Sequence, residues 1–294
     1  MATLNSALLK EIEGIDFYKQ FFLAGIYEDG RETDSERPYL VRVGLDENAA
    51  GSSYVQYQGC TLSCTVIPKA GYYDPLQCVR FKFEKSNVVD KREFEFCCAV
   101  LQDFSRKHVL VDPRSLTFDG EYQYQLVVNI NINTCDGFLL GAVLLGVQTA
   151  LANIKLPTAS VDSTNVEDLE EKFKQGAVVK EKSRFIFDSD KLFQVRLRNR
   201  LSYTGLLLFK DEEDDEPIFL TDPTTDCVAR VNTRFDIIVA ENGKIFLWQS
   251  GVSPDITKEL RKAAYDKALE NAKKVFEVMN TVQEHGRTQS EDME

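Results

Sequence analysis

The sequence predicts an α+β protein built from two related halves. Short segments with alternating apolar residues lead into a strongly apolar helical segment, and strands followed by a helix recur in the second half. The strict strand-helix alternation that is typical of nucleotide-binding sheets is missing from this pattern. With 294 residues, of which 43% are hydrophobic, the chain can bury a substantial core.

The first half is expected to begin with two short amphipathic helices. Asn5 can cap `SALLKEIEG`, and Asp16 can cap `FYKQFFLAG`, which Gly25 would close in a left-handed conformation. The next segments alternate with period two and predict antiparallel strands at `YLVRVGL`, `SSYVQYQG` and `TLSCTVIPK`. A helix at `KREFEFCCAVLQDFSRK` and a long strand at `YQYQLVVNININ` follow.

The most apolar run, 138–156, directly follows this strand and the turn at Asp136-Gly137. It contains Gln148, Asn153 and Lys155, so it predicts a core helix, and we expect no membrane anchor.

The second half is expected to repeat the order of strands and then a helix. An acidic surface excursion at 162–176 precedes predicted strands at `FQVRLRNRL`, `TGLLLFK`, `PIFLTDP`, `FDIIVAE` and `KIFLWQS`. Asn242-Gly243 predicts a hairpin between the last two strands. Ser253 and Pro254 are favourable residues for the start of a long final helix.

Composition excludes several kinds of chemistry. The net charge of -12 argues against a surface that is basic throughout, as in many nucleic-acid-binding proteins. Seven dispersed cysteines without a secretory leader predict reduced intracellular thiols, and two histidines offer little for a zinc site or a nucleophilic triad. Gly141 and Gly146 belong to no phosphate-binding loop and predict close helix packing instead.

Charged clusters leave two interpretations open. The block Asp211–Glu216 could supply metal ligands, but an unbroken acidic run is more typical of a solvated connection, and Asp222 and Asp226 fit turn chemistry. Two basic sets could contact phosphates or could equally form a solvated or interface surface. They are Arg196, Arg198 and Arg200 on one face of a predicted strand, and Lys69, Arg80 and Lys82 near an early strand and its loop.

Six features in the same order resemble the ribonuclease PH-like subunits that form the six-membered ring of the eukaryotic RNA exosome. They are `YEDGRETDSERPYLVRVG`, `AAGSSYVQYQGCTLSCTVIPKA`, `CDGFLLGAVLLGVQTALANIKLP`, `IFLTDPTTD`, the Asn242-Gly243 hairpin and the final helix. The resemblance implies a ribonuclease PH-like fold (ribosomal protein S5 domain 2-like) over 26–283, with an N-terminal helical extension at 1–25 and a disordered tail at 284–294. Within the family, `LTDPT` after `TGLLLFK` is most similar to the ribosomal RNA-processing protein 43 type, with the 42 and 45 types as alternatives.

The resemblance also bears on metal binding. Active phosphorolytic members of the family carry an Asp pair just before the strand that corresponds to `FDIIVAENGKI`, and Val228 and Arg234 stand at these positions here. Nor does `DFSRKHVLVDPRSL` match the family's phosphate-binding arginine and glycine-serine loop. The resemblance therefore implies no metal, no cofactor and no catalytic residues, with Asp222, Asp226 or Asp236 as the alternative ligands.

A non-catalytic ring subunit is the function that the resemblance implies. Its expected partners are other ribonuclease PH-like subunits in a hetero-hexameric ring, S1/KH-type cap subunits, and single-stranded RNA in the channel, for which Lys69, Arg80 and Lys82 are the candidate contacts. The expected location is the nucleus, including the nucleolus, and the cytoplasm. The alternatives are an active phosphate-dependent 3'-to-5' exoribonuclease and a free-standing RNA-binding protein.

Overall fold

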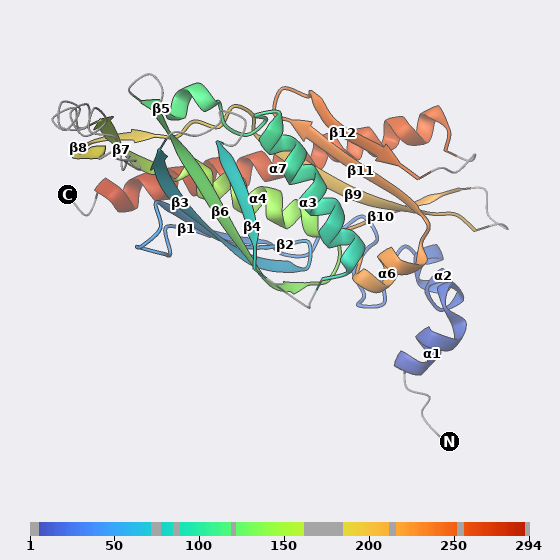
Figure 1. The fold of residues 1–294 in the computed structure, drawn as a ribbon. Coiled ribbons are helices and arrows are strands. Elements are labelled where there is room, and N and C mark those ends of the chain that lie inside the picture. Colours follow the sequence, from blue (N-terminus) through green and yellow to red (C-terminus); the bar gives the residue numbers. More distant parts are fainter. Residues whose placement is uncertain are drawn as a thin grey trace, which may run out of the picture.

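The protein is described by a computed structural model at residues 6–71, 78–84, 89–118, 122–161, 185–211, 216–251 and 256–291. Its elements, shown in Figure 1, are α1 (Ser6–Glu13), α2 (Ile15–Leu23), β1 (Leu40–Val43), β2 (Gly51–Tyr57), β3 (Cys60–Gly71), β4 (Val79–Phe83), α3 (Lys91–Arg106), η2 (Pro113–Leu116), β5 (Thr117–Phe118), β6 (Tyr122–Cys135), α4 (Leu139–Ala152), β7 (Lys155–Val161), β8 (Phe185–Gln194), β9 (Leu201–Phe209), β10 (Ile218–Thr221), α6 (Thr225–Arg230), β11 (Thr233–Ala240), β12 (Ile245–Ser250) and α7 (Lys258–Glu291).

The first half forms a six-stranded sheet. Its order is β1-β2-β3-β6-β4, with β5 also paired to β6. The antiparallel pairing of β1 to β2 and of β2 to β3 confirms the predicted run of consecutive strands. The fifth member, β4, lies parallel to β6. Because β3, β6 and β4 pair side by side, residues at matching register positions share one face of the sheet.

Helix α4 confirms the predicted core helix, since all of its residues are buried. It contacts β2 and β3 from the first sheet and β9 from the second. A Cβ at Gly146 would lie 2.8 Å from Leu62 Cδ1 and 3.0 Å from Cys64 Sγ, so the glycine permits the close helix packing that the sequence predicts. Among the described residues, no helix has the length and apolar character to cross a bilayer.

The second half forms a four-stranded sheet in the order β10-β9-β11-β12. Every residue of β9 is buried, and Gly243 adopts a φ of 77° in the hairpin between β11 and β12, as predicted. The acidic block lies between the antiparallel strands β9 and β10, which confirms that it is a connection, although 212–215 fall outside the described residues. The excursion at 162–176 also falls outside them.

One predicted strand is wrong. Residues 195–200 of `FQVRLRNRL` form no regular strand; β8 ends at Gln194 and pairs with β7 in a separate two-stranded ribbon. The reason is that this segment bonds to another loop: Arg198 N donates to Leu110 O at 2.7 Å, and Asn199 Nδ2 donates to Val109 O at 2.6 Å. The alternating apolar residues of 195–200 therefore belong to a segment that bonds to another loop, and they do not indicate a regular strand.

Helix α7 crosses both halves, since it contacts β9, β11, β1 and α4 (Figure 1). Its predicted apolar stripe is confirmed by the buried side chains of Ala264, Ala268, Ala272 and Met279. The helix begins at Lys258, and the proposed caps Ser253 and Pro254 lie outside the described residues. At its other end it continues to Glu291, through much of the segment expected to be a disordered tail.

Helix α2 packs onto the second half, and α1 contacts α2. Tyr18 and Phe22 of α2 are fully buried, and the Phe22 ring lies 5.2 Å from that of Phe209 at the end of β9. Gly25 is left-handed at a φ of 74°, as predicted. Asp16 does not cap α2, because the helix already begins at Ile15 and Asp16 falls in its first turn. The proposed cap Asn5 is outside the described residues.

Candidate functional site

Arg234 is the centre of a buried charged cluster. It lies two residues before Asp236 on β11, so both side chains project from the same face of the strand. Arg234 Nε donates to Asp236 Oδ1 at 2.8 Å. The other side of the guanidinium faces α3, where Arg234 Nη1 is paired with Glu93 Oε1 and Nη2 donates to Glu93 Oε2 at 3.4 Å. Arg234 therefore links the second sheet to a helix of the first half.

Tyr203 of β9 completes the polar contacts of this cluster. Its hydroxyl donates to Asp236 Oδ1 at 2.7 Å and accepts from Arg234 Nη2 at 3.3 Å. The neighbouring Gly205 makes room for this arrangement, because a Cβ there would lie 2.4 Å from the Phe138 ring and 2.6 Å from the Tyr203 hydroxyl. A larger residue at position 205 would displace at least one of the two rings.

Aromatic rings surround the guanidinium. Arg234 Cζ lies 4.4 Å from the centroid of the Phe138 ring and 5.3 Å from that of Phe96. Such positions favour a cation through the negative face of the ring. Phe138 directly precedes α4, and Phe96 lies on α3, so two elements of the first half contribute rings to the surroundings of an arginine on a strand of the second half.

The electrostatics of the cluster favour a permanently charged arginine. Burial opposes the charge of Arg234, but the charge of Asp236 and the hydrogen bond and charge of Glu93 outweigh it, so the pKa of Arg234 is raised. Burial raises the pKa of Glu93, and the hydrogen bond and charge of Arg234 offset this only in part. Burial and the charge of Asp236 raise the pKa of Tyr203 well above its ordinary value, so its hydroxyl stays a proton donor. The guanidinium thus supplies the positive charge that the two carboxylates require.

A second charged cluster joins three distant parts of the chain. Asp222 is buried and left-handed at a φ of 51°. Its carboxylate accepts from Arg37 Nε at 2.9 Å and from Arg37 Nη2 at 2.5 Å, and it lies 3.5 Å from Arg31 Nη1. Arg37 Nη1 also donates to Asp136 Oδ2 at 2.9 Å, and Asp136 Oδ1 accepts from Thr225 N at 2.9 Å. We call Arg31, Arg37, Asp136 and Asp222 the arginine clamp.

Cations gather on one face of the first sheet. Lys69 on β3 pairs in register with Gln125, and Arg80 and Lys82 on β4 pair with Val127 and Asn129 of the same strand, β6. The three cations therefore share one face, and all are exposed. It is the face opposite α4, because the α4 contacts come from the alternate residues of β3 such as Leu62 and Cys64. Arg80 and Lys82 lie within a strand and not in a connecting loop.

Arg42 on β1 extends this basic face. Its register partner Tyr54 pairs in turn with Ser63, and Ser63 with Asn131, so Arg42 projects from the same side of the sheet. None of the strands in this sheet contains Asp or Glu, although the chain as a whole carries a net charge of -12. We call Arg42, Lys69, Arg80 and Lys82 the basic face; sequence reasoning missed Arg42, and strand register was the signal that could have found it.

Comparison with known proteins identifies the fold. No model of a protein family matches the sequence. Exosome complex component Rrp42 of Methanopyrus kandleri is 26% identical over 277 residues, covering 86% of this chain and 90% of the relative. The structure of the Archaeoglobus fulgidus exosome with RNA bound to the active site matches with a TM-score of 0.66 at 20% identity, over 92% of this chain and 98% of the other. An archaeal exosome core matches with a TM-score of 0.66 at 18% identity, over 94% and 99%.

The chain has the ribonuclease PH-like fold of the exosome core. This confirms the predicted fold. Val228 and Arg234, which stand at the positions expected for the metal-binding Asp pair, lie in different surroundings within it. Val228 lies on α6, half-buried and packed against the hydrophobic core. Arg234 is the second residue of β11, and its side chain lies in the charged cluster. Among the described residues, no three His, Cys, Asp or Glu side chains converge closely enough to hold a metal ion.

Of the alternative acidic ligands in this exosome-core fold, only Asp236 reaches Arg234. Asp222 belongs to the arginine clamp, so its assignment to turn chemistry alone was incomplete. Asp226 is exposed, and its carboxylate accepts from the Tyr18 hydroxyl at 3.5 Å. Sequence reasoning missed Glu93, because α3 brings it to β11 from 141 residues away and no local pattern marks it.

Arg196, Arg198 and Arg200 do not form a common face. Arg198 Nη1 donates to His108 O at 3.4 Å, whereas Arg200 Nη1 pairs with Glu241 at 3.2 Å and Nη2 donates to Phe276 O at 3.0 Å. The segment lacks the strand that would have aligned them. Arg198 and Arg200 thus connect their segment to a loop and to helix α7, whereas Arg196 is exposed, and the three do not form a shared phosphate site.

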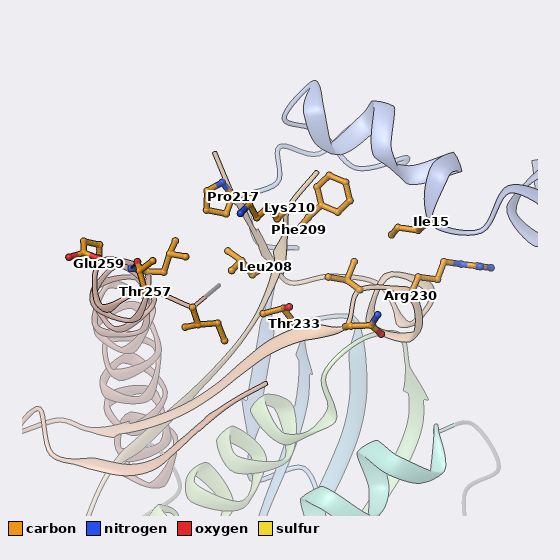
Figure 2. A pocket seen from close by; sticks show the side chains of 13 residues that line it. Ile15, Leu208, Phe209, Lys210, Pro217, Arg230, Thr233, Thr257 and Glu259 are labelled. Carbon is orange, nitrogen blue, oxygen red and sulfur yellow. Dashed lines mark hydrogen bonds between the residues drawn. The ribbon is translucent and has the colours of Figure 1, made fainter. Parts of the chain in front are cut away.

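A pocket of about 870 Å³ lies at one end of the second sheet. Figure 2 shows Glu259 and Thr257 at the start of α7 on one side and Ile15 and Arg230 on the other, with Leu208 and Phe209 of β9 between them. None of the site residues expected from the sequence lines this pocket, although Thr233, which directly precedes Arg234, does. The pocket brings no group of acids or nucleophiles together, so the charged cluster at Arg234 remains the candidate site.

Proposed function

We propose that this chain is a non-catalytic structural subunit of a ribonuclease PH-like ring of the exosome type, which supports 3'-to-5' RNA processing and degradation. The observation that carries the proposal is the pairing of Arg234 with Glu93 and Asp236. A catalytic divalent ion needs carboxylates that converge on it with open positions for phosphate. Here the carboxylates face a fixed guanidinium, and a metal ion would have to enter against its charge.

Phosphorolysis tests this absence of catalysis. Purified chain incubated with single-stranded RNA, magnesium and inorganic phosphate is expected to release no nucleoside diphosphates, while an active archaeal exosome assayed in parallel does. Release that persists through purification and disappears in Glu93→Gln or Asp236→Asn variants would establish the alternative, a phosphate-dependent 3'-to-5' exoribonuclease. Either variant removes one carboxylate charge next to Arg234 and changes the side-chain size very little.

Ring assembly is the second part of the proposal. The similarity to exosome subunits supports ribonuclease PH-like neighbours in a ring. We further propose that the ring is a hetero-hexamer and that S1/KH-type cap subunits bind to it. We assign the chain to the ribosomal RNA-processing protein 43 type, with the 42 and 45 types as alternatives, and to the nucleus, nucleolus and cytoplasm. Tagged chain recovered from its own cells should bring down such partners in stoichiometric amounts. A monomer without them would overturn the assignment.

The basic face is the proposed surface for RNA. Lys69, Arg80 and Lys82 lie on one face of a sheet whose strands contain no Asp or Glu, and phosphate contacts depend mainly on such charge. Their combined change to Glu should weaken RNA protection by the assembled ring at least tenfold and reduce its salt dependence.

The matched control is the triple change of Lys258, Arg261 and Lys262 to Glu, which reverses the same number of exposed cations on α7. Assembly should survive in both triples. Equal RNA protection in both would remove the basic face from the RNA path.

A further inference from the structure

Two thiols meet where the first sheet turns toward α4. Cys60 opens β3, Cys135 ends β6, and the two residues are direct register partners. Their Sγ atoms lie 2.7 Å apart, and both cysteines are free. A disulfide bond is about 2.05 Å long, so only a small approach of the two sulfurs separates this thiol pair from a bond.

The surroundings of the pair give its two members different roles. Cys60 is fully buried, whereas Cys135 is half-exposed and open to a small oxidant. The thiol of Cys60 approaches Phe138 O at 3.6 Å, and that of Cys135 approaches Gly137 O at 3.8 Å. The hydrogen bond with Cys135, together with burial, raises the pKa of Cys60, which keeps it protonated as long as its partner is reduced.

The remaining cysteines show that this geometry is particular. Cys64 and Cys97 are fully buried, and Cys98 on α3 is half-exposed like Cys135. In the described part of the chain, only the sulfurs of Cys60 and Cys135 contact each other. Cys98 therefore has comparable access to solvent without a thiol partner, and it serves as the natural comparison.

We propose that Cys60 and Cys135 form a reversible intrachain disulfide when the protein meets a hydroperoxide. Cys135 loses its proton and its thiolate attacks a peroxide oxygen; the O–O bond breaks, Cys135 becomes a sulfenic acid, and the leaving oxygen takes up the released proton and departs as water when the oxidant is hydrogen peroxide. Cys60 Sγ then attacks the Cys135 sulfur, the S–S bond forms, the S–O bond breaks, and the Cys60 proton leaves in a second water. Two thiols lose two electrons in total, and one peroxide is reduced.

The bond would lie beside the arginine clamp. Arg37 Nη1 is only 2.3 Å from the position that a Cβ at Gly59 would take, and Asp136 directly follows Cys135. Oxidation would link the ends of two strands across 75 residues of chain and so restrict the unfolded state. We expect the oxidised chain to unfold at a temperature roughly 5 °C higher than the reduced chain, a shift that dithiothreitol should abolish.

Peptide mapping of the purified full chain tests the proposal. After graded treatment with hydrogen peroxide, two of its seven cysteines should escape alkylation, and a peptide pair joined through Cys60 and Cys135 should appear and revert with dithiothreitol. The Cys98→Ser variant should behave like the parent, whereas Cys135→Ser should form no linked pair. Mapping of the unaltered chain decides the question even if a variant folds poorly.

Other outcomes would overturn the proposal. They are full alkylation of both Cys60 and Cys135 at peroxide doses that already oxidise Cys98, a linkage between other cysteines, and a linkage only between separate chains. Each of these would show that the short sulfur contact does not lead to a bond between Cys60 and Cys135 of one chain.

Discussion

Arg234 is held by a strand of one half of the chain and by a helix of the other. It contacts Asp236 on β11, Glu93 on α3 and the Phe138 ring before α4. Removing one partner of a buried ion pair costs more than the pair contributes, because the remaining charge stays buried without compensation. Arg234 should therefore be important for stability as well as for the exclusion of a metal ion.

Replacing Arg234 by Met tests this role. The side chain keeps much of its apolar length, but Glu93 and Asp236 lose their cation, so the free energy of unfolding at neutral pH should fall by about 3–5 kcal/mol. Urea unfolding measures the change. Arg196→Met, at an exposed position, should alter stability by no more than about 0.5 kcal/mol. A similarly small loss at Arg234 would contradict the buried ion pair.

Glu93 gives the cluster a distinct pH dependence. Its pKa in the folded protein is raised, chiefly by burial, so between its ordinary pKa and the raised value the folded state binds more protons than the unfolded state. Stability due to Glu93 should thus be present below its ordinary pKa and should decline as pH rises through this window.

The difference in unfolding free energy between the parent and Glu93→Gln, followed from about pH 4.5 upward by denaturant titration, should shift steadily in favour of the Gln variant. An opposite slope would mean that pairing with Arg234 outweighs the effect of burial.

At the scale of elements, β9 packs against the residues that hold the site. It contributes Tyr203 to the polar cluster, and Gly205 leaves space for the Phe138 ring. Overfilling such a position forces side chains or backbone to shift, typically at about 1–3 kcal/mol.

Gly205→Ala should therefore destabilise the protein by about 1–3 kcal/mol, measured by thermal unfolding. Ser202→Ala in the same strand is the control. The Ser202 hydroxyl is buried and has no hydrogen-bond partner within the described residues, so its removal should be neutral or slightly stabilising. A harmless Gly205→Ala would show that Phe138 can move away freely.

Periodicity predicted most of these elements, and its failures have physical causes. The strand at β6 and the buried helix α4 follow from patterns that tertiary contacts reinforce. Residues 195–200 alternate like a strand but give their backbone bonds to a loop. The clusters were harder to predict, because Glu93 and Asp222 acquire their roles from partners far away in the sequence.

At the scale of the whole molecule, the arginine clamp joins the segment before β1, the turn after β6 and the segment after β10. Asp222 accepts from Arg37 through both its oxygens, and it occupies a left-handed conformation that Asp and Asn tolerate better than Ala does. Charge and backbone conformation thus act together at this residue.

Asp222→Ala should lower the free energy of unfolding by about 3–5 kcal/mol, because Arg37 then stays without its buried carboxylate. Asp222→Asn should lose less, since it tolerates the same backbone and still accepts one hydrogen bond. Denaturant unfolding compares the two, with exposed Asp226→Asn as a near-neutral control. Equal losses in the two Asp222 variants would mean that the charge alone matters.

The cation at Arg234 is part of the polypeptide, so the stability of this region should not depend on the ions in the surrounding solution. A metal ion at this place would be lost to a chelator and would follow the supply of free magnesium, with a gain in stability set by its concentration. The guanidinium of Arg234 is covalently part of the chain, so it is always present, and it is always charged. The fold around Glu93 and Asp236 should therefore unfold at the same temperature in EDTA as in millimolar magnesium, so the protein can keep its structure while metal levels fluctuate.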